Sequence, residues 1–421
     1  MNQLAALYVP GGMTADQAAR RAIEVGPTVR QAEAAVAIAE AGARQARLAF
    51  FPDTQLSYRY TRLSDISLPP SFDVFKIILD QHQFEATATL PVTDMFLTIL
   101  PSYRSAQNAV KTAEFQIQSE HYNVALRARE TYYEHLRALG SEIVARQAVE
   151  QALAHQAQVT ALVNAGASAR VELYRVDAAL ARARVNAAQA DLGVRTTTVA
   201  LRALLDLDAD VAISIGEDLE SIPERLEGSE EDLLQRALSH RVEVQALEAL
   251  AASKRLEIRA RGNGRLPQVA VQGAAVYADP NQRYFNLVEG FRGTWSVSAI
   301  ARWSPNDAAL AQHRMRAAQA ELVQIEGDME RLSDSVRVEV AQAYHGYTAA
   351  RAQLEAATAG VQAAEESYRV RFAQLRAGAA VTSDLLDAQT DLNIARLELV
   401  NASTAVRLAR ARLIHAVGEQ R

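Results

Sequence analysis

The chain has 421 residues, a formal net charge of −6 and no cysteine. The charges are spread without a basic block, which argues against nucleic acid as a main partner, and the lack of cysteine excludes disulfides, thiolate metal sites and a thiol nucleophile. Aromatic residues make up only 6% of the chain, and 19 Gly and 11 Pro are few for its length, so the composition favours long helices over several compact domains.

The chain begins with MNQLAALYVPGG, which lacks the basic end and the long apolar core of a secretion signal. If the protein is exported, we expect the signal to have been removed ahead of Met1. No run of 18 apolar residues follows, so the sequence predicts no membrane-spanning helix.

The first half of the chain changes its hydrophobic period twice. Alanine-rich helical sequence runs up to Pro52, after which apolar and polar residues alternate with the period of two that indicates strands. The predicted order is a helix over 14–48, strands over about 53–62 and 83–92, a long helix over about 99–163, and a helix over about 169–206.

The second half follows the same order. Residues 206–229 are acidic and irregular, with a possible short strand at Val211 to Ile215, and we interpret them as a linker. The predicted elements after it are a helix over 230–260, strands over about 268–277 and 293–303, a long helix over about 307–376, and a helix over about 382–417.

Matching residues recur at a nearly constant offset. Pro52 and Pro267 lie 215 positions apart, and Gly166 and Gly378 lie 212 apart. Such an offset, near half the chain length, indicates an internal duplication. We therefore predict a first repeat over residues 1–210 and a second over 230–421, on either side of the linker.

Heptad repeats predict how the helices pair. The last helix carries apolar residues every seven positions, with a row of alanines three places later: Leu385, Leu392, Leu399, Val406 and Leu413. This is the pattern of a left-handed coiled-coil seam. The long helix before it has its own heptad series, so the two are expected to form an antiparallel hairpin that turns around Gly378, and Gly166 marks the equivalent turn in the first repeat.

The four strands have one apolar and one polar face. Four strands are too few to close a barrel, since about eight are the practical minimum, so we expect other copies of the chain to complete the sheet. Apolar side chains outward and polar ones inward fit a membrane β-barrel with a wet lumen. The candidates for its aromatic belts are Tyr58, Tyr60, Phe84, Trp295 and Trp303.

A soluble sandwich with two core tryptophans is the alternative interpretation of these strands. The attached helices favour the membrane barrel, because a helix of about 70 residues is ~105 Å long and fits no compact globule of this size.

Local motifs accompany this plan: FPDTQLSYRYT and LPQVAVQGAAVY where strands begin, AQAYHGYTAAR in the second long helix, and LRAGAAVTSDLLDAQTDLNIARLEL at the second turn. With the duplicated order of elements, they resemble the TolC family of outer-membrane channel proteins over nearly the whole chain. The resemblance implies a mostly α fold with a small β part, in which a homotrimer builds a 12-stranded transmembrane β-barrel and a periplasmic tunnel of helical hairpins. The strand count alone leaves a dimer open.

The resemblance also implies a function and partners. The protein would be the passive exit duct of a tripartite efflux pump or a type I secretion system, in the outer membrane of a Gram-negative bacterium. It would contact outer-membrane lipid, a periplasmic adaptor protein and, through the adaptor, an inner-membrane transporter. The cargo, whether drug, metal or polypeptide, stays open.

Two sets of residues near the turns follow from the resemblance. The positions that match the acids of the family's periplasmic aperture are Asp384, Asp387, Glu172 and Arg175, the last of which departs from an all-acid ring. Acids in the first turn of a helix are also favoured by its dipole alone. The positions that match the adaptor-docking tips are Gly166, Ala167, Ser168, Ala169, Val171, Leu173, Gly378, Ala379, Ala380, Val381, Thr382, Ser383 and Leu385. The two glycines could instead serve only the backbone of the turns.

No catalytic constellation, metal-ligand spacing or phosphate-binding glycine loop appears, so the sequence predicts neither an enzyme nor a cofactor. The alternative function is a pore-less coiled-coil scaffold or a membrane-surface structural protein. It would explain the heptads but not the two pairs of alternating strands.

Overall fold

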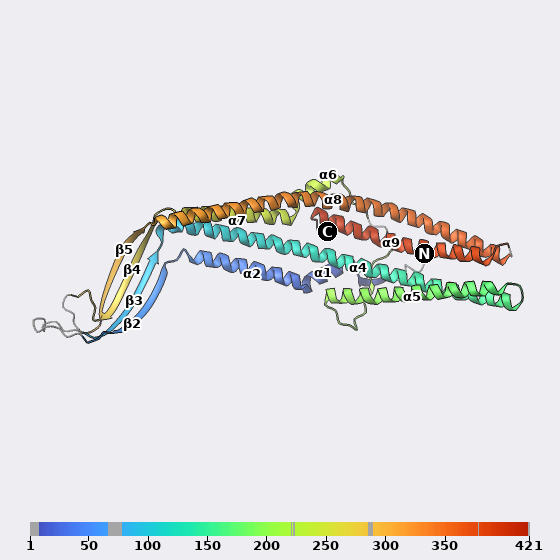
Figure 1. The fold of residues 1–421 in the computed structure, drawn as a ribbon, viewed down its shortest axis with the longest axis horizontal. Coiled ribbons are helices and arrows are strands. Elements are labelled where there is room, and N and C mark those ends of the chain that lie inside the picture. Colours follow the sequence, from blue (N-terminus) through green and yellow to red (C-terminus); the bar gives the residue numbers. More distant parts are fainter. Residues whose placement is uncertain are drawn as a thin grey trace, which may run out of the picture. The chain divides into compact units, whose positions relative to one another are not determined.

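The computed structural model describes residues 8–65, 78–219, 221, 224–284, 289–377 and 379–419. In chain order the elements are β1 (Tyr8–Met13), α1 (Ala15–Val25), α2 (Pro27–Leu48), β2 (Asp53–Arg62), β3 (Asp80–Leu90), α3 (Val92–Asp94), the π-helical segment η3 (Met95–Ile99), α4 (Leu100–Asn164), α5 (Arg170–Leu205), α6 (Glu230–His240), α7 (Val242–Asn263), β4 (Gln268–Asp279), β5 (Arg292–Arg302), α8 (Pro305–Arg376) and α9 (Thr382–Val417). The predicted class, mostly helical with four antiparallel strands, is confirmed (Figure 1).

The chain divides into two compact units that several long helices traverse. Unit 1 comprises residues 1–33, 116–244 and 331–421, and unit 2 comprises residues 34–115 and 245–330. Each unit therefore takes segments from both halves of the sequence.

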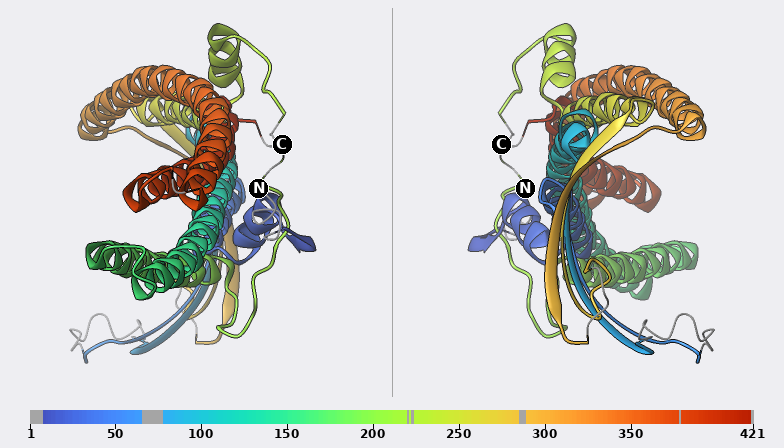
Figure 2. Two further views of the ribbon diagram at one scale, coloured as in Figure 1. Left: turned by 90° about the vertical axis from the view of Figure 1, so that its right-hand side faces the viewer. Right: turned by 90° about the vertical axis from the view of Figure 1, so that its left-hand side faces the viewer.

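Unit 2 contains the sheet. Its strands follow the order β2-β3-β4-β5, and every neighbouring pair is antiparallel. The central pairing, β3 with β4, joins strands from the two halves of the chain, and Figure 2 shows the four strands as one curved ribbon.

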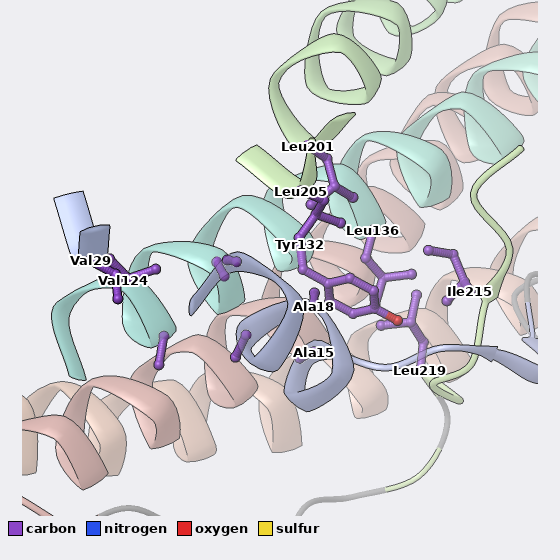
Figure 3. Packing of buried hydrophobic residues seen from close by; sticks show 14 residues of the cluster. Ala15, Ala18, Val29, Val124, Tyr132, Leu136, Leu201, Leu205, Ile215 and Leu219 are labelled. Carbon is purple, nitrogen blue, oxygen red and sulfur yellow. The ribbon is translucent and has the colours of Figure 1, made fainter. Parts of the chain in front are cut away.

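Unit 1 has a hydrophobic core where α1 packs on α4 and α5. The small residues Ala15, Ala18 and Ala22 let α1 approach closely, and the fully buried Tyr132 fills the space beside them (Figure 3). The Tyr132 hydroxyl donates to the Met13 carbonyl at 2.8 Å, so the one polar atom of this ring is satisfied. Burial raises the pKa of Tyr132 well above its ordinary value of 10.0.

A second core in unit 1 repeats this arrangement with α6, α8 and α9. Ala237 on α6 is fully buried against Val336 and Val340 of α8, and Leu413 of α9 closes the cluster. Each short helix thus anchors one long hairpin.

The four long helical segments of unit 1 lie in the order α5, α4, α9, α8. Gln156 of α4 donates to Asp177 of α5 at 2.7 Å. On the other side of α4, Arg396 of α9 donates to Gln147 at 3.3 Å, and the same guanidinium reaches Glu365 of α8 at 3.1 Å. In the part of the chain that the structure describes, no hydrogen bond or ion pair links α5 with α8 or α9. The helices α5 and α8 are therefore the outermost of the four, and near the turns α8 also contacts α4, where Tyr368 lies 3.2 Å from His155.

Two predicted helices are interrupted. The helix expected over 14–48 breaks into α1 and α2 at Gly26, whose ψ of 125° is extended, because the following Pro27 disfavours helical backbone before it. The helix expected over 230–260 breaks into α6 and α7 at Arg241, whose ψ is 127°. No proline explains this second break. The turn points the Arg241 side chain into unit 1, where its Nε donates to the Ala416 carbonyl at 2.9 Å and its guanidinium pairs with Glu339 at 2.7 Å.

The segment after the second strand also differs from the prediction. The strand covers 80–90 rather than 83–92, and helical structure begins at Val92 instead of about residue 99. A π-helical turn, Met95–Ile99, precedes Pro101, which has no N–H to donate inside a helix. In place of the possible strand at Val211 to Ile215, the structure has only isolated bridges of Ile215 with Tyr8 and Met13. The strand β1 was not predicted from the sequence.

Within the described residues, every helix is too short or too polar to cross a lipid bilayer. The same part of the chain holds no group of three or more His, Asp or Glu side chains arranged for a metal ion.

Candidate functional site

The sheet of unit 2 has one apolar and one polar face, and the pairing of its strands aligns these faces across all four strands. Tyr58 lies opposite Phe84, Phe84 lies opposite Tyr277, and Ala275 lies opposite Trp295, so residues from all four strands share one face. On the other face, Ser57 lies opposite Glu85, and Gln272 lies opposite Ser298. Three central side chains of the apolar face are strongly exposed: Leu56 at 87%, Trp295 at 74% and Val297 at 68%. This face is apolar and uncovered within the described chain, which is the reverse of a protein core.

An aromatic cluster lies at the end of the sheet away from the helices. The Tyr58 and Phe84 rings are 4.6 Å apart between centroids, and Tyr277 stacks on Phe291 at 5.1 Å. The Tyr58 hydroxyl lies 2.9 Å from Nδ1 of His82. The predicted belt residues Tyr58, Tyr60 and Phe84 belong to this cluster, whereas His82, Tyr277 and Phe291 are members that sequence reasoning missed. Of these three, only Tyr277 could have been predicted from the sequence, because it continues the alternation of apolar and polar residues along its strand.

Exposed aromatic residues also gather at the helical end of the sheet. Trp303 directly follows β5, is 59% exposed, and donates from its indole nitrogen to the Arg265 carbonyl at 3.1 Å. Phe51, just before β2, and Phe96, just after β3, are 63% and 68% exposed and were not predicted. Trp295 and Trp303 are eight residues apart, which spans about 26 Å along a strand. The apolar band of a membrane barrel is about 25 Å tall.

The second candidate site is the pair of helical turns in unit 1, which lie at the same end of the two hairpins (Figures 1 and 2). In the first turn Gly166 has a φ of +72°, and the N–H of Ala167 donates back to the Leu162 carbonyl at 2.9 Å. In the second turn Ala379 donates to the Gln374 carbonyl at 2.9 Å. The predicted turn residue Gly378 lies outside the described residues.

The predicted aperture residues differ in how they are paired. Glu172 is largely buried and accepts a hydrogen bond from Arg175 at 3.0 Å, so this acid and its basic neighbour neutralise each other. Asp384 lies 3.9 Å from Arg371 of α8, a partner that sequence reasoning missed because it lies across the turn. Asp387 is exposed on the next turn of α9, and within the described residues it has no ion pair. Of the four residues, Asp387 is thus the one most available to attract cations.

Most predicted docking residues are accessible at the turns. Ala167, Ala169, Val171, Ala379 and Val381 are exposed, and Ser168, Leu173, Ala380, Thr382 and Ser383 are partly exposed. Leu385 is only 1% exposed, so the expectation that it contacts a partner is wrong. It is the first leucine of the heptad seam, and its side chain is directed into the hairpin.

A buried histidine joins the two hairpins near these turns. His155 of α4 is 5% exposed, and its Nε2 lies 3.2 Å from the Tyr368 hydroxyl of α8. The Phe372 ring completes the cluster at 6.2 Å from the imidazole. Burial lowers the pKa of His155 below its ordinary value of 6.5.

We expect the contact between His155 and Tyr368 to weaken in acid. A separated hairpin lets His155 bind a proton near pH 6.5, whereas the packed one resists it, so the stabilisation is complete above that pH and is lost as the pH falls below it. The protection factors of the amides of residues 367–376 against hydrogen exchange should therefore fall more from pH 7.5 to pH 5 in the wild type than in His155→Gln. Equal changes in the two proteins would contradict this role of the imidazole.

Comparisons with known proteins agree with this arrangement. The family model described as "Outer membrane efflux protein" matches residues 18–206 and 233–419. Among solved structures, CusC, which is described as folding and forming a transmembrane channel, has a TM-score of 0.82 at 16% identity, with coverage of 98% of this chain and 94% of CusC. The outer membrane channel CmeC of Campylobacter jejuni has a TM-score of 0.81 at 16% identity, with coverage of 96% and 85%. VceC of Vibrio cholerae, an outer membrane protein, has a TM-score of 0.78 at 17% identity, with coverage of 96% and 96%. A search of curated proteins gives no match.

Proposed function

The chain belongs to the outer membrane efflux protein family, and on this basis we propose that it forms the exit duct of a tripartite efflux pump or a type I secretion system. In this proposal unit 2 crosses the outer membrane of a Gram-negative bacterium through its sheet, and the hairpins of unit 1 lie in the periplasm. Cargo passes through without any chemistry on the protein, and energy comes from an inner-membrane transporter.

The observation that carries the proposal is the sheet with its two unlike faces. Its exposed apolar face suits lipid, its polar face suits water, and aromatic residues gather at both ends of the strands, as in membrane barrels. A pore-less scaffold gives no reason for Leu56, Trp295 and Val297 to remain uncovered on one side of a sheet.

The edges of the sheet support closure by further copies. Its outer strands, β2 and β5, each pair on one side only within the described chain. They run in opposite directions, because β2 leads away from the helices and β5 leads back to them. An antiparallel pair between β5 of one copy and β2 of the next continues the alternation without interruption. Family membership favours three copies, and hence a barrel of 12 strands.

The turns of unit 1 form the periplasmic mouth in this proposal. Asp384 and Asp387 contribute negative charge at the aperture, and the small exposed residues around the two turns receive a helical hairpin of the adaptor protein. Glu172 is paired with Arg175, and Asp384 with Arg371. Asp387 is therefore the main source of negative electrostatic potential at the mouth.

The charge at the mouth predicts an ion preference. We expect the purified protein to conduct in planar bilayers with a preference for cations, and Asp384→Asn/Asp387→Asn to lower the cation-to-anion permeability ratio several-fold while conductance remains. Reversal potentials in a salt gradient measure the ratio, and Asp334→Asn, exposed on α8 far from the turns, is the control. Absence of any conductance would contradict the duct, whereas an unchanged ratio in a conducting double variant would contradict only the acidic aperture.

A further inference from the structure

The loop between β4 and β5 folds back onto the polar face of the sheet in unit 2. Asn281 in this loop is only 4% exposed, and its amide donates to the Thr294 hydroxyl at 3.2 Å and to the Arg292 carbonyl at 2.9 Å. Thr294 lies four residues before Ser298 on β5, so both side chains belong to the polar face. The side chain of Asn281 therefore anchors the loop on that face.

Arg283 is held on the polar face by the same loop. Its backbone N–H donates to Oδ1 of Asn281 at 3.0 Å, and its guanidinium donates to the Ser296 hydroxyl at 3.2 Å and to the Trp295 carbonyl at 3.1 Å. Both partners of the guanidinium are neutral, and the residue remains exposed. Since a guanidinium has five N–H donors, further donors of Arg283 are available to an anion.

A second guanidinium lies on the same face. Arg292 begins β5 two residues before Thr294, so its side chain shares the polar face. Its guanidinium lies 5.0 Å from the centroid of the Tyr284 ring, a cation–π contact that holds it against the loop. In the part of the chain that the structure describes, neither Arg283 nor Arg292 contacts a carboxylate, and this includes Glu289 of the same loop.

The rest of the polar face adds little opposing charge near this loop. From the middle of the sheet to its end away from the helices, the register places Arg59, Glu85 and Arg292 on this face as its charged side chains. Glu85 accepts a hydrogen bond from Gln83 at 3.1 Å. With Arg283 added by the loop, the basic groups outnumber the acid, so the outer half of this face is positive.

We propose that Arg283 and Arg292 form an anion-binding site that narrows the outer end of the duct and takes cargo carrying phosphate or carboxylate groups. This inference rests on the proposed function, because the polar face lines a lumen only in the barrel. Guanidinium groups bind phosphate and carboxylate through paired N–H donors, and rings of arginine give a pore a preference for anions. The exit of the duct is then opposite in charge to its acidic periplasmic mouth.

The ion preference of the pore tests the charge of this site. Arg283→Gln/Arg292→Gln should raise the cation-to-anion permeability ratio several-fold in planar bilayers, because positive charge is removed from the lumen. Arg283→Lys/Arg292→Lys retains both charges and should stay close to the wild type. Arg62→Gln is the matched control and should leave the ratio unchanged, because Arg62 lies at the same end of the sheet on the apolar face, where it pairs with Asp80.

Inorganic pyrophosphate tests anion binding directly. Added to the solution that the barrel end faces, it should reduce the wild-type current at a concentration several-fold lower than Arg283→Gln/Arg292→Gln requires.

Cysteine labelling tests the position of the loop, because the chain has no cysteine of its own. A negatively charged methanethiosulfonate reagent should change the conductance of Arg283→Cys in steps and leave that of Arg62→Cys unaffected.

The possible failures have separate meanings. If the wild type conducts, but the double glutamine variant has the same permeability ratio and the same block by pyrophosphate, the anion site is overturned and the duct remains. Equal changes in the glutamine and lysine variants would overturn it too, because they would assign the effect to the loop conformation. A conductance change in Arg62→Cys but not in Arg283→Cys would overturn the position of the loop in the lumen. Protein that does not conduct at all would overturn the proposed function itself.

Discussion

Val297→Arg is expected to prevent stable insertion of the protein into the outer membrane. Val297 lies at the centre of β5 on the apolar face, 68% exposed, where the proposed barrel meets the middle of the bilayer. An arginine at the midplane of a membrane barrel costs about 2–4 kcal/mol, and a ring of identical chains incurs that cost in every copy. The fraction of protein that fractionates with outer membranes as a heat-labile oligomer measures the effect.

The control for this substitution is its neighbour. Ser298→Arg places the same side chain on the polar face of the same strand, where water is available, and insertion should be preserved. If both variants insert equally well, the apolar face does not contact lipid. If Ser298→Arg alone fails, the two faces have been assigned in reverse.

Ala379→Trp is expected to abolish export while leaving the pore formed. Ala379 is exposed in the second turn, outside both flanking helices, so an indole there has room in the isolated protein but occupies the space that an adaptor hairpin needs. Ala167→Trp makes the equivalent change in the first turn, and Gly166 keeps its left-handed backbone in that variant. We expect loss of efflux in a susceptibility assay, with single-channel conductance and oligomeric mass unchanged.

Asn186→Trp provides the matched control, because Asn186 is exposed on α5 away from the turn. It should retain efflux. Wild-type efflux by Ala379→Trp and Ala167→Trp together would contradict docking at the turns, whereas loss of conductance would mean that the indole disturbs the pore.

The two-residue period of the strands made their faces predictable. Alternation fixes which side chains share a side once a strand forms, so Tyr58, Phe84 and Trp295 could be placed on one face from the sequence. The grouping of His82 with Phe291 could not, because it depends on the pairing of β3 with β4, which joins residues almost 200 positions apart. The resemblance to TolC-family channels is confirmed by the family match, whereas the roles of the belt, aperture and docking residues stay predictions.

The two interrupted helices show where the local sequence is not enough to predict a helix boundary. Pro27 is a local signal for the break between α1 and α2, which the alanine-rich pattern obscured. Arg241 carries no such signal, since its turn is stabilised by Ala416 and Glu339 from distant helices. For Leu385 the local sequence was the better guide. Its heptad position already indicated burial, but the resemblance to the family at the turn was given more weight.

The even number of strands in the sheet has a consequence for how such a duct could change in evolution. The chain enters the sheet at β2 and leaves it from β5 at the same helical end, so in the proposed barrel every crossing of the membrane is matched by a return. An additional two-stranded unit inserted between β3 and β4 would enlarge the bore in a discrete step without moving any helix to the other side of the membrane. A single added strand would invert the direction of β5, and β5 could no longer pair antiparallel with β2 of the next copy.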